Sequence, residues 1–164
     1  MNIFYLHHLP KIAAQFHCDK HVVKMIVESC QLLATAHHEH GNGQHVTYKP
    51  THKNHPSAIW TRGSATQYDY VLTLAIALCK EYTHRYGKEH KCNQYLAGEL
   101  SKPPLAIADN HSWVNPPQCM PDEYKHYDTV KAYRQYYQSK DPAWARTYYR
   151  GTGQQPSWIG VSYA

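Results

Sequence analysis

One stretch of the chain places an amine, a carboxylate and two imidazoles along one side of an expected helix. Residues 15–37, QFHCDKHVVKMIVESCQLLATAH, carry a polar seam at intervals of four, three, four and three residues: His17, His21, Lys24, Glu28 and Gln31. At about 100° per residue these positions span about 80° of arc. The other side chains are mostly apolar, which is typical of a buried helix. The polar seam must therefore face partners, water or a cleft, because an unpaired buried charge is costly.

A cleft would bring together three kinds of chemistry. Lys24 offers an amine, Glu28 a carboxylate and His21 a proton carrier. Burial and neighbouring charges would tune their proton affinities for acid–base work. The alternative is structural: an intrahelical Lys24–Glu28 pair worth about 0.3–0.5 kcal/mol, with the histidines bonded to nearby backbone. We take the cleft as the working prediction.

A metal site is a further alternative. His17 and His21 are four residues apart, the spacing that lets two imidazoles on a helix hold one ion. The segment HCDKH lacks the general-base glutamate of HExxH, and nothing in the sequence fixes a third ligand. We therefore predict neither a metal nor a cofactor, and keep a histidine-dependent metallonuclease or nucleotide hydrolase as an alternative.

A second polar cluster, YKPTHKNHP at residues 48–56, precedes an expected helix start, where free amide hydrogens and the helix dipole favour an anion. A solvated turn is the alternative. Farther along, tyrosines mix with cations near residues 122–137, as on surfaces that hold nucleic acid, although such rings also pack in cores. The predicted DNA-binding residues are Lys20, Lys49, His52, Lys53, Asn54, Lys125 and Arg134.

The elements expected to position these residues are helices. Pro10 suits the first position of a helix that continues to about residue 38, with a break near 17–19 where Asp19 could cap a second segment. Residues 39–55 are predicted to be a loop. Pro56 opens the next helix, which Gly63 and Ser64 interrupt and Gly87 ends.

The second half contains fewer helix signals. A short helix is expected within residues 89–102, an irregular crossing over 103–122, a helix around 128–140 and a loose tail. No segment indicates a strand. The prediction is a compact, all-α fold with long irregular loops, forming a single domain over residues 1–164.

The composition agrees with this prediction and also indicates the kind of partner that the protein binds. The 164 residues have a formal charge of +5 and include 15 tyrosines and four tryptophans, a combination that favours a polyanion such as DNA or a nucleotide. The five cysteines are widely spaced and are expected to be reduced thiols. No apolar run reaches the roughly 20 residues of a membrane span, so a cytoplasmic location is expected. The oligomeric state is left open.

Two ends of the chain resemble the phage pyrimidine-dimer DNA glycosylase (endonuclease V) family. That family carries an Asp-x-His pair followed seven residues later by a catalytic Glu, as Asp19, His21 and Glu28 do here. Its C-terminal pattern is matched by Pro156-Ser157-Trp158 and a final Tyr-Ala. The segments NHPSAIWTRG and EYTHRYGK also resemble a bacterial and phage branch grouped with these enzymes.

The resemblance implies an all-α DNA glycosylase that attacks the sugar C1′ of a damaged nucleotide with its N-terminal amine. The attack forms an imine, and elimination can then cut the strand as an abasic-site lyase does. Asn2 is too large for ordinary removal of Met1, so the amine of Met1 is the expected nucleophile and Lys24 its substitute. Glu28 would stabilise positive charge on the sugar.

This chain departs from the family where arginines flank the Glu, since it has Val27 and Gln31 there. The expected substrate is therefore a damaged or modified base of unspecified identity. A non-catalytic nucleic-acid-binding protein is the remaining alternative.

Overall fold

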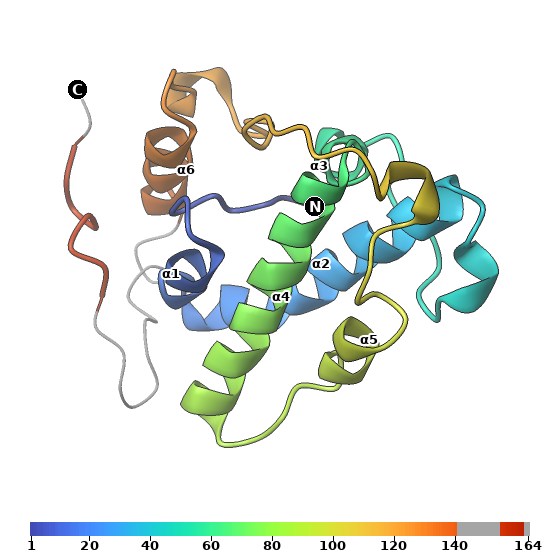
Figure 1. Ribbon diagram of the computed structural model, residues 1–164. Helices are drawn as coiled ribbons and strands as arrows, with labels where there is room; N and C mark the ends of the chain where they lie inside the picture. Colours follow the sequence, from blue (N-terminus) through green and yellow to red (C-terminus); the bar gives the residue numbers. More distant parts are fainter. Residues whose placement is uncertain (141–154, 163–164) are drawn as a thin grey trace.

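The structure, a computed structural model, describes residues 1–140 and 155–162. Within these residues it contains α-helices and short 3-10 turns and no strand, so the all-α prediction is confirmed (Figure 1). The α-helices are α1 (Pro10–Gln15), α2 (Asp19–Glu39), α3 (Pro56–Thr61), α4 (Ala65–Tyr86), α5 (Asn93–Ala97) and α6 (Thr129–Gln138). The 3-10 turns are η1 (Gly43–His45), η2 (Leu105–Ile107) and η3 (Asp122–Tyr124).

Two long helices, α2 and α4, form the centre of the fold and pack on each other, while α1 packs on α4 (Figure 1). The start of α4 is fixed by Ser64, whose hydroxyl oxygen accepts from the amide of Gln67 at 3.2 Å. Its end is fixed by Gly87, which has φ of +66°, a conformation that glycine adopts without steric cost. Local sequence thus sets the length of the central helix.

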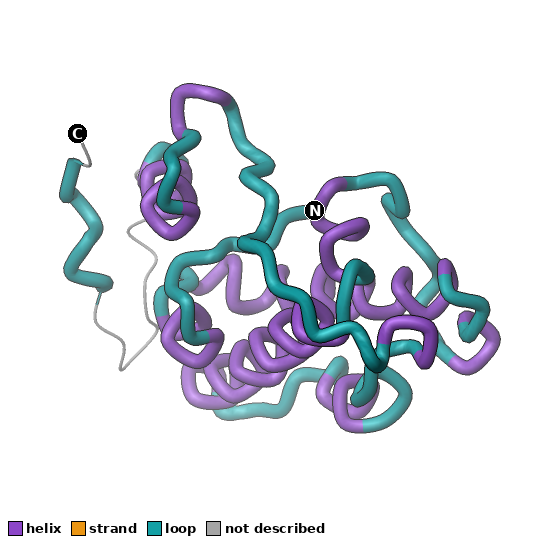
Figure 2. Tube along the Cα trace, turned by 45° about the horizontal axis from the view of Figure 1, so that its top comes forward, coloured by secondary structure: helices purple, strands orange, loops and turns teal. Residues whose placement is uncertain are grey.

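The first residues form an extended segment that leads from α1 back across the helices (Figures 1 and 2). Ile3, Phe4, Tyr5 and Leu6 are all buried. The hydroxyl of Tyr70 donates to the carbonyl of His7 at 3.2 Å, and Nε of Arg134 donates to the carbonyl of Leu6 at 3.0 Å. These contacts fix the path of the chain toward its N-terminus.

The predicted helix boundaries at Pro10, Pro56, Gly63–Ser64 and Gly87 are confirmed. The prediction that Asp19 caps the second segment is wrong: Cys18 is the N-cap of α2 and makes no side-chain cap, and Asp19 is the first helical residue. The Asp19 carboxylate instead accepts from the buried guanidinium of Arg85 at 3.0 Å.

The second half agrees with prediction in outline. The helix expected within residues 89–102 is limited to α5, and residues 103–122 are irregular apart from η2 and the first residue of η3. Asp128 caps α6 by accepting from the amides of Val130 and Lys131 at 2.9 and 3.2 Å. The tail over 141–154 and the final Tyr163–Ala164 lie outside the described residues.

The buried apolar side chains form one cluster that extends from the N-terminal segment to Trp158. Four of the five cysteines are buried and all are free thiols, as expected from their spacing. In the described part of the chain, no helix combines the length and the hydrophobicity that crossing a membrane requires.

Candidate active site

The centre of the polar seam is a pair of side chains one turn apart on α2. Nζ of Lys24 lies 3.1 Å from Oε1 of Glu28. The Lys24 side chain is 63% exposed, whereas that of Glu28 is 15% exposed. The carboxylate therefore lies at the edge of the core, with an ammonium on its solvent side.

The beginning of the chain reaches the other oxygen of the same carboxylate. The Met1 nitrogen lies 4.0 Å from Oε2 of Glu28, and the amide of Asn2 donates to Oε2 at 3.3 Å. The Met1 side chain is only 2% exposed, so residue 1 is packed into the protein. Two primary amines thus lie near one carboxylate, the Lys24 nitrogen at 3.1 Å and the Met1 nitrogen at 4.0 Å.

Residues from the second half of the chain hold Asn2 in place. Nδ2 of Asn2 donates to the carbonyl of Cys119 at 2.9 Å, and the hydroxyl of Tyr133 lies 2.8 Å from Oδ1 of Asn2. Cys119 Sγ in turn lies 3.6 Å from the hydroxyl of Ser57 at the start of α3. Sequence reasoning missed these residues, because contacts between such distant positions leave no local pattern.

His55 lies close enough to the Met1 amine and to Glu28 for both charges to act on it. Its pKa is lowered by burial first, then by the positive N-terminal amine and His52, while Glu28 acts in the opposite direction. Its Nδ1 accepts from the amide of Ser57 at 3.1 Å and so caps α3. The cap already occupies an amide at the helix start that was expected to favour a phosphate.

The structure places His21 differently from Lys24 and Glu28. His21 is 2% exposed, its Nδ1 lies 2.9 Å from the hydroxyl of Tyr137, and its ring stacks on Phe4 at 4.4 Å. Burial, and then the nearby charges of His17 and two lysines, hold its pKa far below the usual range. His21 is therefore packed against the ring of Phe4 and bonded to the hydroxyl of Tyr137.

His17 does not continue the seam either. It precedes α2, is fully buried, and its Nδ1 lies 2.7 Å from the carbonyl of Ala13. Among the described residues, no three His, Cys, Asp or Glu side chains are grouped so that they could hold a metal ion.

Most of the predicted DNA-binding residues are exposed: Lys20, Lys49, His52, Lys53, Asn54 and Lys125. Two of them have acidic neighbours, with Lys53 3.8 Å from Glu39 and Lys125 2.7 Å from Asp122. Their positive charge is thus partly balanced in the absence of DNA.

Arg134 has a structural contact in addition. Besides its bond to Leu6, its guanidinium lies over the rings of Phe16 and Trp158, at 5.6 and 5.2 Å from their centroids. The expected aromatic surface on α6 is not formed by Tyr133 and Tyr137, which are both buried. These two tyrosines pack in the core.

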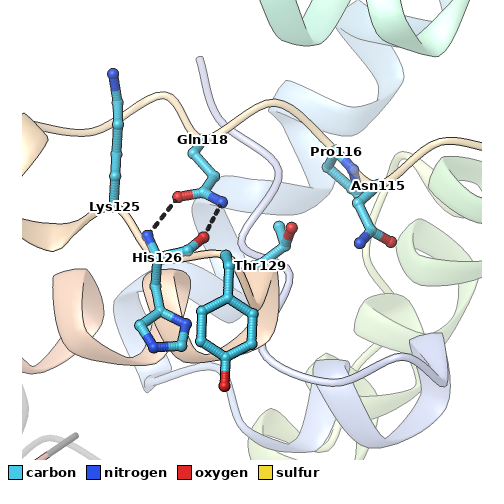
Figure 3. Close-up of a pocket in the computed structure, with 7 residues that line it drawn as sticks. Asn115, Pro116, Gln118, Lys125, His126 and Thr129 are labelled. Carbon is cyan, nitrogen blue, oxygen red and sulfur yellow. Dashed lines mark hydrogen bonds between the residues drawn. The ribbon is translucent and has the colours of Figure 1, made fainter. Parts of the chain in front are cut away.

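A hollow on the surface lies between residues 115–118 and 125–129 (Figure 3). The amide group of Gln118 bonds to both backbone groups of His126, at 2.6 and 3.0 Å, and so joins the two sides. Tyr127 is 90% exposed, and its ring centroid lies 4.2 Å from that of His126. Lys125 is also part of the lining.

An all-helical fold with an N-terminal amine near a carboxylate on its central helix fits the DNA glycosylase expected from the sequence. The comparison with known families agrees: residues 1–94, more than half of the chain, match the family described as pyrimidine dimer DNA glycosylase. The chain belongs to this family and is a DNA glycosylase-type enzyme that binds DNA as its substrate. The match favours an enzyme over the non-catalytic alternative. Searches of curated proteins and of solved structures gave no match.

Proposed function

We propose that the enzyme removes a damaged or modified base from DNA through an imine between the Met1 amine and C1′ of the sugar. The observation that carries this proposal is the 4.0 Å separation between the Met1 nitrogen and Oε2 of Glu28. A free amine next to a carboxylate is a nucleophile beside a group that can accept its proton.

The proposed chemistry has two stages. The amine lone pair forms a bond to C1′, the bond from C1′ to the base breaks, and the base leaves with the electron pair and takes up a proton. The nitrogen then loses a proton, the C1′–O4′ bond opens and O4′ is protonated, which leaves a protonated imine. Loss of a C2′ proton from this species expels the 3′-phosphate and cuts the strand.

Glu28 has two roles in this scheme. Its negative charge stabilises the positive charge that develops on the sugar and then on the imine. It also accepts and returns protons at the nitrogen and at O4′. A carboxylate that is 15% exposed suits these roles, because a partly desolvated charge acts more strongly on its neighbours.

Two amines lie near Glu28, those of Lys24 and Met1, and we assign the nucleophile to Met1. An α-amine has an ordinary pKa near 8 and a lysine near 10.4, so a larger fraction of an α-amine is neutral at working pH. The Met1 nitrogen also belongs to a residue whose side chain is 2% exposed, whereas the Lys24 side chain is 63% exposed and can take many orientations. We assign Lys24 to charge balance at Glu28.

His21, a catalytic candidate from the sequence, receives a supporting role in this proposal. Its stacking on Phe4 holds the extended segment three residues from Met1. DNA contacts are assigned to Lys20, Lys49, His52, Lys53, Asn54 and Lys125, with the hollow beside Lys125 as an extension of that surface. Arg134 contributes charge while it holds Leu6 and the ring of Trp158.

The family name makes pyrimidine dimers the first substrate to test. The purified protein would be incubated with duplexes that carry a cyclobutane dimer, an abasic site or a panel of modified bases, in the presence of borohydride. A reduced protein–DNA adduct is expected on the cognate lesion and on the abasic site, and peptide mass spectrometry would locate it on Met1. Absence of any adduct from folded protein would overturn the proposal.

A further inference from the structure

Asn2 uses three hydrogen-bonding groups on three separate parts of the fold. Its backbone amide donates to Glu28 on α2 at 3.3 Å, and its Nδ2 donates to the carbonyl of Cys119 at 2.9 Å. Its Oδ1 lies 2.8 Å from the hydroxyl of Tyr133 on α6. Because the backbone amide and both polar side-chain atoms of Asn2 are bonded, Asn2 has little freedom to move. The peptide bond that joins it to Met1 is therefore held in place.

Tyr133 is itself held firmly. Its side chain is fully buried, and its hydroxyl lies 2.5 Å from the carbonyl of Pro117 as well as 2.8 Å from Asn2. The hydroxyl thus joins the N-terminal residues to the crossing segment that contains Pro117 and Cys119. The ring is rigid because it is packed against Phe4 in the core, at 6.1 Å between centroids.

We propose that Asn2 and Tyr133 are positioning residues that aim the Met1 amine at C1′. This inference rests on the proposed function, and it adds a part of the site that lies outside residues 1–94, the region that matches the family. The clamp, defined as Asn2, Tyr133 and the carbonyls of Pro117 and Cys119, sets where the amine lies relative to Glu28. Neither side chain touches the reacting atoms in this scheme.

Two substitutions remove the clamp without a large change of shape. Tyr133→Phe deletes the hydroxyl and keeps the buried ring. Asn2→Leu keeps a side chain of similar size and removes both polar atoms. Leucine at position 2 is also too large for ordinary removal of Met1, so the same amine is retained, whereas alanine would change the N-terminus as well.

The measurement is the single-turnover rate of borohydride trapping on a duplex with one abasic site, together with the dissociation constant for the same duplex. Misplacement of a reacting group by about 1 Å can cost up to roughly 100-fold in rate. We therefore expect each variant to trap about 10- to 100-fold more slowly, with DNA binding within about twofold of wild type. The double variant should be no slower than the slower single variant, because the two side chains form one unit.

Tyr68→Phe is the matched control. Tyr68 is also fully buried, and its hydroxyl donates to the carbonyl of Leu100 at 2.9 Å, away from residues 1 and 2. It should lose a similar amount of thermal stability and keep the wild-type trapping rate. If Tyr133→Phe and Asn2→Leu trap at the wild-type rate, or slow no more than Tyr68→Phe does, the inference is wrong.

The outcomes separate this inference from the proposed function. If wild-type protein forms no adduct on any duplex, the proposed function fails. If wild type forms an adduct at Met1 and both clamp variants match it, only the inference fails. An adduct located on Lys24 would overturn the inference as well, because the clamp does not hold that amine.

Discussion

Glu28 and Met1 lie at opposite ends of a 27-residue separation in sequence, yet the carboxylate and the first nitrogen are 4.0 Å apart. The contact requires the extended segment to turn back over α2, and the burial of four consecutive apolar residues holds it there.

Glu28→Gln should slow base release and adduct formation by at least about 100-fold, because the amide carries no charge and is a poor proton acceptor. Binding to the same duplex should change less than about threefold, since Glu28 carries no positive charge that meets phosphate. Single-turnover rates and a binding titration would measure the two effects. Equal losses of rate and binding would contradict the assigned role.

Acetylation of the N-terminal amine should abolish trapping, because an amide nitrogen cannot form the imine. Lys24→Ala serves as the comparison and should keep trapping within about tenfold of wild type, since it removes only a charge partner of Glu28. Adduct yield on abasic duplex would measure both. Trapping by the acetylated protein, together with its loss in Lys24→Ala, would transfer the nucleophile to Lys24.

Lys49→Gln and Lys53→Gln should each weaken DNA binding. Each should also make the dependence of log K, where K is the binding constant, on log salt less steep by about 0.9, as expected when one phosphate contact is lost. Lys53 also pairs with Glu39, so its variant should show the smaller effect. Binding isotherms at several salt concentrations would measure the slopes. Unchanged slopes in both variants would place the DNA on another surface.

Arg85→Met should destabilise the fold by about 3–5 kcal/mol, because it leaves carboxylates without their buried partner. Arg85 lies 3.0 Å from Asp19 and 2.8 Å from Glu81, and it also donates to the carbonyls of His17 and Gln15. Urea unfolding would measure the loss. A change in the free energy of unfolding below about 1 kcal/mol would show that the ion pairs of Arg85 contribute little to stability where α1 meets α2.

Stability should fall as the pH drops from about 6.5 toward 4, partly because of His17. Burial lowers the pKa of His17 to about 4 from its usual 6.5, so between these values the unfolded chain binds a proton that the folded chain does not. The loss amounts to about 1.4 kcal/mol per pH unit for this residue.

His17→Asn tests this dependence, because an asparagine can still reach the Ala13 carbonyl and does not titrate. Urea unfolding between pH 4.5 and 7.5 should give a slope that is smaller by about 1.4 kcal/mol per pH unit. An unchanged slope would mean that His17 is protonated in the folded protein.

The sequence predicted the parts of this structure that depend on nearby residues. Pro10, Pro56 and Gly87 set helix ends by their own backbone preferences, and Ser64 does so by its side-chain cap. Lys24 and Glu28 meet because they are one helical turn apart. The assignment of one domain over the whole chain stays a prediction.

Contacts between distant segments could not be predicted in the same way. Asp19 has the residue type of a helix cap, and only the packing of α4 brings Arg85 to it. His21 shares the face of Glu28 by helical period, yet the N-terminal segment and α6 cover it with Phe4 and Tyr137. Helical period defines a direction, and tertiary packing decides what lies there.

The hydrogen bond between Asn2 and Tyr133 joins residues that are 131 positions apart in the sequence. Closing such a long loop costs conformational entropy, so we expect this contact to form late in folding. A nascent chain on the ribosome has its amine and its carboxylate long before α6 is made. Under the proposed mechanism, a product truncated before α6 would carry Met1 and Glu28 but lack Tyr133, one of the two residues proposed to position the amine.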